Sequence, residues 1–272
     1  MNNDAILTFF AKYIEKELGI VYSEANYYQL EHRLNEIRSK LGLSTLDDLY
    51  INAQTEIGGS FKNLLLDLAT NNETSFFRDP NIFKAFSSKV LQDKLDKNDN
   101  KLSMWSAASS SGQEIYSLLM EIDQFQENKL FYFDLSFLAT DVSDTILKRA
   151  RDGIYSNLEV HRGLSEAHLK RYFSPIGSDS WEFTHSLRRQ IAFTKLNLLD
   201  TWAYTGPYDV IFCRNVLIYQ SVENKIKILN ELAKKIKPNG YLILGAAESL
   251  FGLSNEFNQI SESSAILYQK KA

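Results

Sequence analysis

The sequence has a single cysteine, Cys213, among its 272 residues. An internal disulfide and a zinc site built on paired thiolates are therefore both excluded. No stretch reaches the roughly 20 uncharged apolar residues that a membrane-spanning helix needs, and the first residues lack the basic start of a secretory signal. We expect a cytoplasmic protein, in a reducing compartment and without membrane insertion.

The chain also lacks a strong excess of charge of either sign, since 30 Lys and Arg oppose 34 Asp and Glu. This balance disfavours a general nucleic-acid binder, which usually presents a basic face. Only 12 glycines and 4 prolines accompany 44% hydrophobic residues, a composition typical of a chain that folds throughout. His161, His168 and His185 do not have metal-ligand spacing, so we expect no metal site.

Helical periodicity dominates the first seventy residues. Apolar side chains recur at helical spacing through residues 6–14 and again through 30–41, with no strand pattern between them. Gly42 predicts the end of one helix, and Ser44 predicts the N-cap of the next. The sequence therefore predicts a small helical domain at the amino terminus.

From about residue 101, short apolar runs alternate with longer helical patterns, as in βα units on a parallel sheet. Strands are predicted at 102–105, 137–141, 208–213 and 241–245. Helices are predicted after Gly112, after Ser143, and over 222–236, where Pro238 and Gly240 would stop the last one. Residues 156–192 lack this alternation and are interpreted as an insertion.

Parallel sheets bind ligands at the carboxyl ends of their strands, so residues 106–112, Asp141 and 213–215 should converge on one crevice. The turn at 106–112 has one glycine instead of the Gly-x-Gly-x-x-Gly of dinucleotide sites, which disfavours a nicotinamide cofactor. A small turn with an acid for ribose hydroxyls fits adenosine without a pyrophosphate. Spacing alone leaves a second interpretation open, in which residues 109–111 are a solvent-facing turn and Asp141 caps a helix.

Residues 70–80, Thr-Asn-Asn-Glu-Thr-Ser-Phe-Phe-Arg-Asp-Pro, resemble the signature that joins the two domains of chemotaxis receptor methyltransferases, the CheR family. Residues 105–114, 139–141, 212–219 and 245–250 resemble further family motifs in the same order. The resemblance implies an all-α N-terminal domain over 1–71. It also implies a Rossmann-like methyltransferase domain over 72–272, with a mostly parallel sheet and a small inserted β-subdomain at 156–192.

The resemblance further implies transfer of a methyl group from S-adenosylmethionine (SAM) to a glutamate carboxylate, leaving S-adenosylhomocysteine (SAH). Glu114 would contact the methionine end, Asp141 the ribose, and residues 196–199 the adenine. Arg78 and Tyr219 would line the methyl-transfer site. The residues that fall where the family surrounds the cofactor are Asn72, Thr74, Arg78, Glu114, Asp141, Asn197, Leu198, Arg214 and Asn215.

This chemistry needs no catalytic base, because a glutamate with a reference pKa of about 4.3 is already ionised at neutral pH. Catalysis then depends on holding the carboxylate and the sulfonium methyl in line and away from water. An arginine binds a carboxylate through paired donors and a tyrosine hydroxyl adds a third, which suits Arg78 and Tyr219.

As partners, the resemblance implies the cytoplasmic helices of chemoreceptors, with the enzyme itself a monomer. A receptor tether peptide would bind the inserted subdomain, where residues 181–189 offer a strand edge. Two alternatives stay open: a catalytically retired SAM-binding adaptor, and an amine methyltransferase. Amine methyltransferases commonly carry an Asn-Pro-Pro-Tyr loop where this chain has Arg-Asn-Val-Leu at 214–217.

Overall fold

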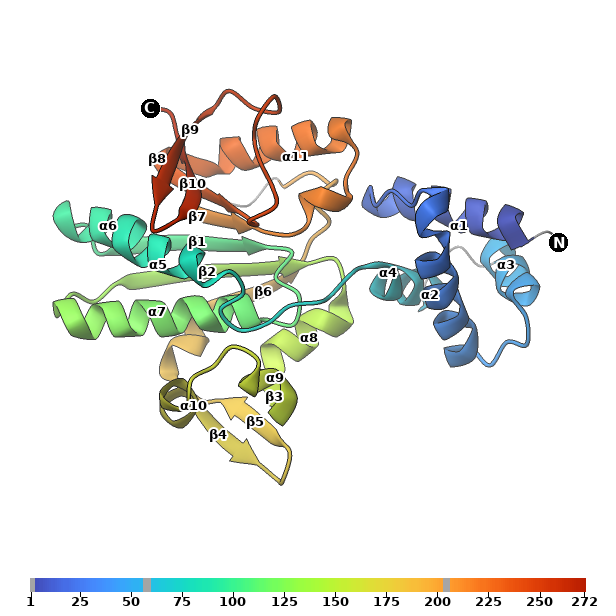
Figure 1. The fold of residues 1–272 in the computed structure, drawn as a ribbon, viewed down its shortest axis with the longest axis horizontal. Helices are drawn as coiled ribbons and strands as arrows, with labels where there is room; N and C mark the ends of the chain where they lie inside the picture. Colours follow the sequence, from blue (N-terminus) through green and yellow to red (C-terminus); the bar gives the residue numbers. More distant parts are fainter. Residues whose placement is uncertain (1–2, 56–59, 203–205) are drawn as a thin grey trace.

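A computed structural model of the chain describes residues 3–55, 60–202 and 206–272. Figure 1 shows a helical part on one side of a larger α/β part, with the linker over residues 70–79 between them. The arrows of the central strands point toward the helical part, so the carboxyl ends of these strands face it. Within the described ranges, no helix has the length and apolar content of a membrane span.

The described residues of the helical part form four α-helices and a short 3-10 turn around a core of their own, and the sequence predicts a helical domain here. Their bounds are α1 Asn3–Leu18, η1 Glu24–Asn26, α2 Tyr27–Lys40, α3 Leu46–Thr55 and α4 Ser60–Ala69. The predicted cap of α3 at Ser44 is wrong by one residue. Thr45 Oγ1 accepts from the Asp48 N–H at 3.1 Å, and the Asp48 carboxylate accepts from the Thr45 N–H at 2.9 Å.

A seven-stranded sheet forms the centre of the α/β part, in the order β6-β2-β1-β7-β8-β10-β9. The first five strands are parallel, and β10 runs antiparallel to both β8 and β9. This confirms the predicted mostly parallel sheet. The strands are β1 Lys101–Ala107, β2 Asp134–Asp141, β6 Ile191–Lys195, β7 Tyr208–Cys213, β8 Ile236–Leu244, β9 Phe257–Glu262 and β10 Ala265–Lys270.

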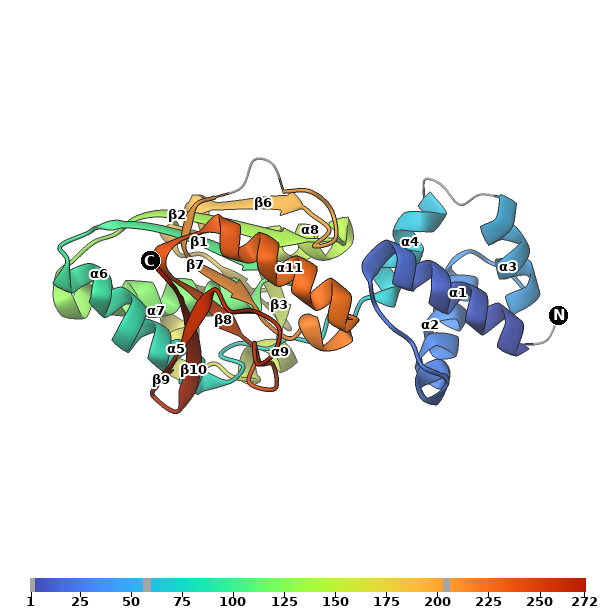
Figure 2. The same cartoon turned by 90° about the horizontal axis from the view of Figure 1, so that it is seen from above.

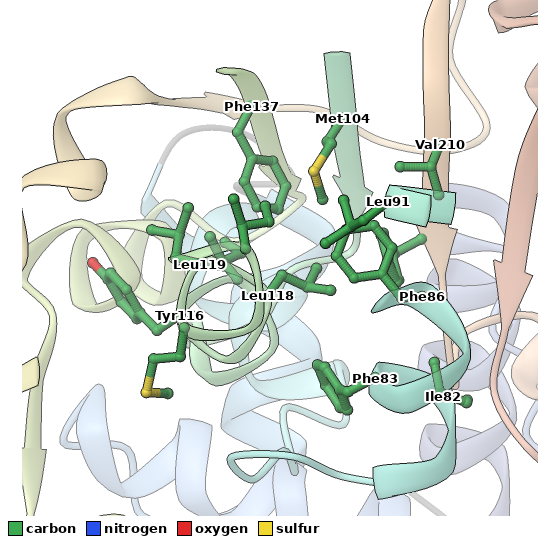
Figure 3. Close-up of a cluster of buried hydrophobic side chains, with 14 of the residues drawn as sticks. Ile82, Phe83, Phe86, Leu91, Met104, Tyr116, Leu118, Leu119, Phe137 and Val210 are labelled. Carbon is green, nitrogen blue, oxygen red and sulfur yellow. The ribbon is translucent and has the colours of Figure 1, made fainter. Parts of the chain in front are cut away.

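Helices cover both faces of this sheet. Successive side chains of a strand point to opposite faces, and here both sets are apolar, so each face must be buried. On one face Met104, Phe137 and Val210 pack against α5, η2 and α7, as Figure 3 shows. On the other face Trp105 and Ile211 pack against α11, which Figure 2 shows lying across the strands. The helices of the first face are α5 Pro80–Ala85, the π-helical turn η2 Phe86–Leu91, α6 Gln92–Asp96 and α7 Gln113–Lys129; α11 spans Val222–Lys235.

The junction between α11 and β8 differs from the sequence-based prediction. The helix ends at Lys235, and β8 begins at Ile236 instead of near residue 241. The pairing of β8 with β7 shifts register between Tyr208 and Val210, and this irregularity accommodates Pro238 and Gly240 within the strand. A Cβ at Gly240 would lie 2.8 Å from the Asp209 carbonyl oxygen, so the close approach of the two strands requires glycine.

A second, three-stranded sheet with the order β3-β5-β4 lies beside the main one. Two corrections follow for this region. Ile191 and Ala192, predicted to end the insertion, pair with β2 in the main sheet. The strand edge predicted at 181–189 is wrong, because β5 is the central strand and has neighbours on both sides. The elements here are α8 Asp144–Asp152, β3 Ile154–Ser156, α9 Asn157–His161, α10 Glu166–Tyr172, β4 Phe173–Ile176, β5 Ser180–Phe183 and η3 Ser186–Gln190.

A buried ion pair fastens α6 to the start of β7. Lys94 Nζ lies 2.6 Å from Asp209 Oδ1, and the two side chains are 11% and 10% exposed. Asp209 also accepts from the Ser103 N–H at 2.8 Å and from Lys237 at 2.9 Å. Burial pushes the pKa of Asp209 up, but the hydrogen bonds from Lys94, Ser103 and Lys237 outweigh burial, and the pKa lies below its ordinary value.

We therefore expect Asp209→Ala to lower the free energy of unfolding by about 3 kcal/mol, because it leaves the buried Lys94 ammonium short of a partner. The contribution of Asp209 is complete above the pKa of an unfolded aspartate, about 3.9, and is lost as pH falls through the lower folded pKa. Urea unfolding at several pH values measures both effects. Asp152→Ala, which breaks an exposed pair with Lys148, is the control and should cost under about 0.5 kcal/mol. A loss as small as the control's would contradict the prediction.

Candidate functional site

A cavity opens at the carboxyl ends of β1, β2 and β7, where the sheet order reverses direction between β1 and β7. The structure brings every predicted site residue to its wall. These residues are Asn72, Thr74, Arg78, Glu114, Asp141, Asn197, Leu198, Arg214, Asn215 and Tyr219. They come from the linker, from α7 and from three strand ends, so the fold alone gathers side chains that are far apart in the sequence.

The turn after β1 takes an unusual path because Ala108, Ser110 and Gly112 all adopt the left-handed conformation. At Gly112 only glycine fits, since a Cβ would lie 3.0 Å from Ala150 Cβ and 3.1 Å from the Tyr155 hydroxyl. Packing of the turn against α8 and β3 therefore fixes its shape.

Asp141 closes this turn from the tip of β2. Its carboxylate accepts from the Ser110 N–H at 2.9 Å and from the Ser143 N–H at 3.1 Å. Burial raises the pKa of Asp141 even though these N–H donors pull the pKa down. The helix-capping interpretation is wrong, because Ser143 Oγ caps α8 by accepting from the Ile146 N–H. A solvent-facing turn is also wrong, because the turn's Ser109 is buried.

Arg214 is the buried cation of the site, with a side chain only 2% exposed. Its guanidinium lies 2.9 Å from Glu114 Oε2 and 2.8 Å from Asp79 Oδ2, and it donates to the Arg78 carbonyl oxygen at 2.7 Å. One side chain at the tip of β7 thus joins the linker to the first turn of α7.

The linker lines the cavity and is held by hydrogen bonds to the α/β part and by one within itself. Ser110 Oγ donates to the Asn72 carbonyl oxygen at 2.9 Å, and Arg78 Nη1 donates to the Glu73 carbonyl oxygen at 3.0 Å. Glu73 in turn pairs with Arg162 of the inserted segment at 2.8 Å. Arg78 is half-buried, and its side chain lines the cavity from this linker.

Tyr219 also lines the cavity, where the helical part meets the α/β part. Its hydroxyl accepts from Asn71 Nδ2 at 2.8 Å, and its carbonyl oxygen accepts from the Val21 N–H at 3.0 Å. The next residue, Gln220, donates to the Leu18 carbonyl oxygen at 2.9 Å and forms a β-bridge with Ile20.

The helical part also contacts residues 196–199, which are predicted to lie next to the adenine. Asn197 Nδ2 donates to the Glu17 carbonyl oxygen at 2.7 Å, and Asn197 Oδ1 accepts from the Leu199 N–H at 3.0 Å. Leu18 and Ile20 line the cavity, which sequence reasoning missed. They carry no local motif, and only the docking of the helical part brings them to the site.

Buried polar atoms in this wall fit a bound polar ligand. Among the described residues, Ser109 Oγ, Arg214 Nε and Gln220 Oε1 are buried without a hydrogen-bond partner, and all three residues line the cavity. Natural proteins leave few such atoms without a partner. Acidic Glu114 and basic Arg214 suit an amino-acid end, and Asp141 suits hydroxyl groups. The ranges that the structure describes hold no cluster of three or more metal-ligating side chains.

Comparison with known proteins gives a family model and close relatives. The model described as "CheR methyltransferase, SAM binding domain" matches residues 72–266. The chain is 39% identical over 265 residues to "Chemotaxis protein methyltransferase Cher2" of Pseudomonas putida, covering 96% of each chain. It is 39% identical over 271 residues to "Chemotaxis protein methyltransferase 1" of Pseudomonas aeruginosa, covering 98% of each chain.

A third relative, "Chemotaxis protein methyltransferase" of Vibrio parahaemolyticus, is 37% identical over 263 residues, which is 96% of this chain and 95% of that one. The matched SAM-binding domain contains all ten residues of the cavity wall that the sequence singled out, and SAM is the cofactor of this domain. On the extent of the model match and the coverage of these relatives, the chain belongs to the CheR methyltransferase family.

Proposed function

We propose that this chain transfers the methyl group of SAM to glutamate side chains in the cytoplasmic helices of chemoreceptors, giving methyl esters. Family membership makes the chain a SAM-dependent methyltransferase of chemotaxis, and the proposal adds the acceptor group. The observation that carries it is the position of Arg78 and Tyr219. Both line the cavity that also contains Glu114, Asp141 and Arg214.

The charges of the cavity wall indicate how SAM, the methyl donor, would bind; we call this part of the cavity the donor half. SAM, when bound, supplies a methyl group attached to a positively charged sulfur. Glu114 would accept from its ammonium group, and Arg214 would donate to its carboxylate. Asp141 would accept from the ribose hydroxyls, and Leu198 would contact the adenine. Since Glu114 and Asp79 hold Arg214 in place, this half is ordered by its own ion pairs.

Arg78 and Tyr219 would hold the acceptor carboxylate. A guanidinium has five N–H donors, and Arg78 donates from Nη1 to the Glu73 carbonyl oxygen. The Tyr219 hydroxyl accepts from Asn71 and keeps its own hydrogen for donation. A carboxylate held by both groups is already the nucleophile, because the reference pKa of glutamate is about 4.3. Orientation and exclusion of water then supply the rate, without a general base.

The alternatives receive less support from the site. A retired adaptor that only binds SAM has no use for an arginine and a tyrosine hydroxyl on the cavity wall. An amine methyltransferase needs acceptors for N–H groups at the tip of β7. That tip presents Arg214, a donor whose guanidinium is paired with two carboxylates, and its Asn215 is followed by Val-Leu instead of the Pro-Pro-Tyr common in amine methyltransferases.

The setting of the reaction is part of the proposal. We infer a cytoplasmic monomer whose partner is the receptor's cytoplasmic helices. A receptor tether peptide would add to the small sheet at an outer strand, β3 or β4, because β5 is enclosed between them.

Asp141→Ala should weaken SAH binding about tenfold to a hundredfold, because it removes a charged acceptor for the ribose hydroxyls, worth about 1.5–3 kcal/mol. Titration calorimetry with SAH measures this. Asp144→Ala, a neighbouring acid with a 65% exposed side chain, is the matched control and should bind SAH normally. Equal affinity of the Asp141→Ala protein and the wild type would remove Asp141 from the donor site.

Arg78→Ala should lower kcat about a hundredfold and SAH affinity much less, because its main contact is with the acceptor carboxylate and misplacement of that group is costly. Methyl transfer to receptor membranes gives kcat, and calorimetry gives the affinity. Arg189→Ala, an exposed arginine outside the cavity wall, is the control. If kcat and affinity fell equally, Arg78 would belong to the donor half.

Receptor membranes incubated with the protein and methyl-labelled SAM should gain label that mild alkali releases as methanol, because esters hydrolyse where methylamines do not. A receptor whose acceptor glutamates are replaced by alanine should gain none. Alkali-stable label would point to amine methylation, and SAH binding without any transfer would point to the adaptor.

A further inference from the structure

Glu248 lies in the turn after β8 and is half-buried. Its carboxylate accepts three backbone N–H groups. Oε2 accepts from Asn215 at 2.7 Å and from Gly245 at 2.8 Å, and Oε1 accepts from Ile218 at 3.2 Å. Two of these donors belong to the turn after β7, so one side chain fastens that turn to the end of the neighbouring strand.

The turn after β7 needs such support because its backbone is unfavourable. Asn215 has a φ of 58°, in the left-handed region that non-glycine residues seldom adopt. The short turn η4 Leu217–Tyr219 follows at once, and Ile218 is its middle residue. The charge-assisted hydrogen bonds from Asn215 and Ile218 to Glu248 stabilise both the left-handed backbone at Asn215 and the turn η4.

Close packing around Glu248 leaves little freedom for another arrangement. A Cβ at Gly245 would lie 2.6 Å from Asn215 Nδ2 and 2.9 Å from Glu248 Oε2. A side chain at position 245 would thus displace the Asn215 amide or the Glu248 carboxylate from its present place. The carboxyl ends of β7 and β8 therefore pack closely together around the Glu248 carboxylate.

We propose that Glu248 is a positioning residue for methyl transfer. Through Asn215 it fixes the donor side of the cavity, and through Ile218 it fixes the hydroxyl of Tyr219 on the acceptor side. The acceptor half of this inference rests on the proposed function, whereas the donor half depends only on the SAM site.

Glu248→Gln tests the donor half. The amide keeps the length of the side chain but removes the charge that strengthens all three hydrogen bonds, the one from Asn215 included, and it replaces one acceptor oxygen with a donor, so at least one backbone N–H loses its partner. We expect SAH affinity to fall about tenfold and the unfolding midpoint of the ligand-free protein to fall by only about a few degrees, the cost of one unpaired N–H. Glu256→Gln changes an exposed acid in the same loop and should leave both values unchanged.

A double-mutant cycle tests the acceptor half. If Glu248 acts through Tyr219, Glu248→Gln should lower kcat on receptor membranes about tenfold in the wild type and much less in a Tyr219→Phe background. A merely structural effect of Glu248 would lower kcat by the same factor in both backgrounds, which would overturn this half.

Gly245→Ala provides a second variant in case Glu248→Gln does not fold. It keeps the carboxylate but pushes on Asn215, and we expect the same loss of SAH affinity. Unchanged SAH affinity in either folded variant overturns the donor half. If the wild type transfers no methyl to receptors while Glu248→Gln still weakens SAH binding, the proposed function fails and the donor half stands.

Discussion

A buried positive charge must be paired with negative charge, and this constraint on Arg214 organises the site. The guanidinium has no solvent to stabilise it, so Glu114 of α7 and Asp79 of the linker must both approach it. Their approach brings the first turn of α7, the tip of β7 and the linker backbone at Arg78 to one point. The linker cannot shift without weakening an ion pair in the interior. Arg78 is therefore held over the cavity through its backbone carbonyl oxygen, which accepts from Arg214.

Much of this arrangement could be predicted from the sequence, because it depends on local patterns. The bounds of β7 match the prediction, and Ser143 caps α8 as expected. The predicted site residues at strand ends line one cavity, since the carboxyl ends of parallel strands share an edge. The linker residues and Glu114, which also line it, were predicted from the resemblance to the CheR family. Thr45 takes the cap predicted for Ser44 because both are good N-cap residues and only the backbone chooses between them.

The rest depends on long-range packing that leaves no mark on the local sequence. Nothing near residue 181 indicates that its strand will be central and not at an edge, because that depends on where β3 and β4 dock. β8 starts as early as Ile236 because its pairing with β7 is irregular there. Pro238 and Gly240 predict a break before the strand, so this start could not be predicted from the sequence. Leu18 and Ile20 reach the cavity only because the helical part docks against Gln220. Residues 245–250 resemble a family motif, but the role of Glu248 within it could not be predicted, since that role lies in contacts with backbone N–H groups 30 to 33 residues away.

The attachment of the helical part to the α/β part has a consequence for the environment in which the protein works. Asn197 and Gln220 attach it through neutral amides that donate to the last carbonyl groups of α1, and the Val21 N–H donates to another carbonyl. None of these groups carries a net charge, so dissolved salt screens them little, in contrast to surface ion pairs. The wall that Leu18 and Ile20 add to the cavity should thus keep its place across wide swings of cellular ionic strength, such as those that accompany osmotic stress.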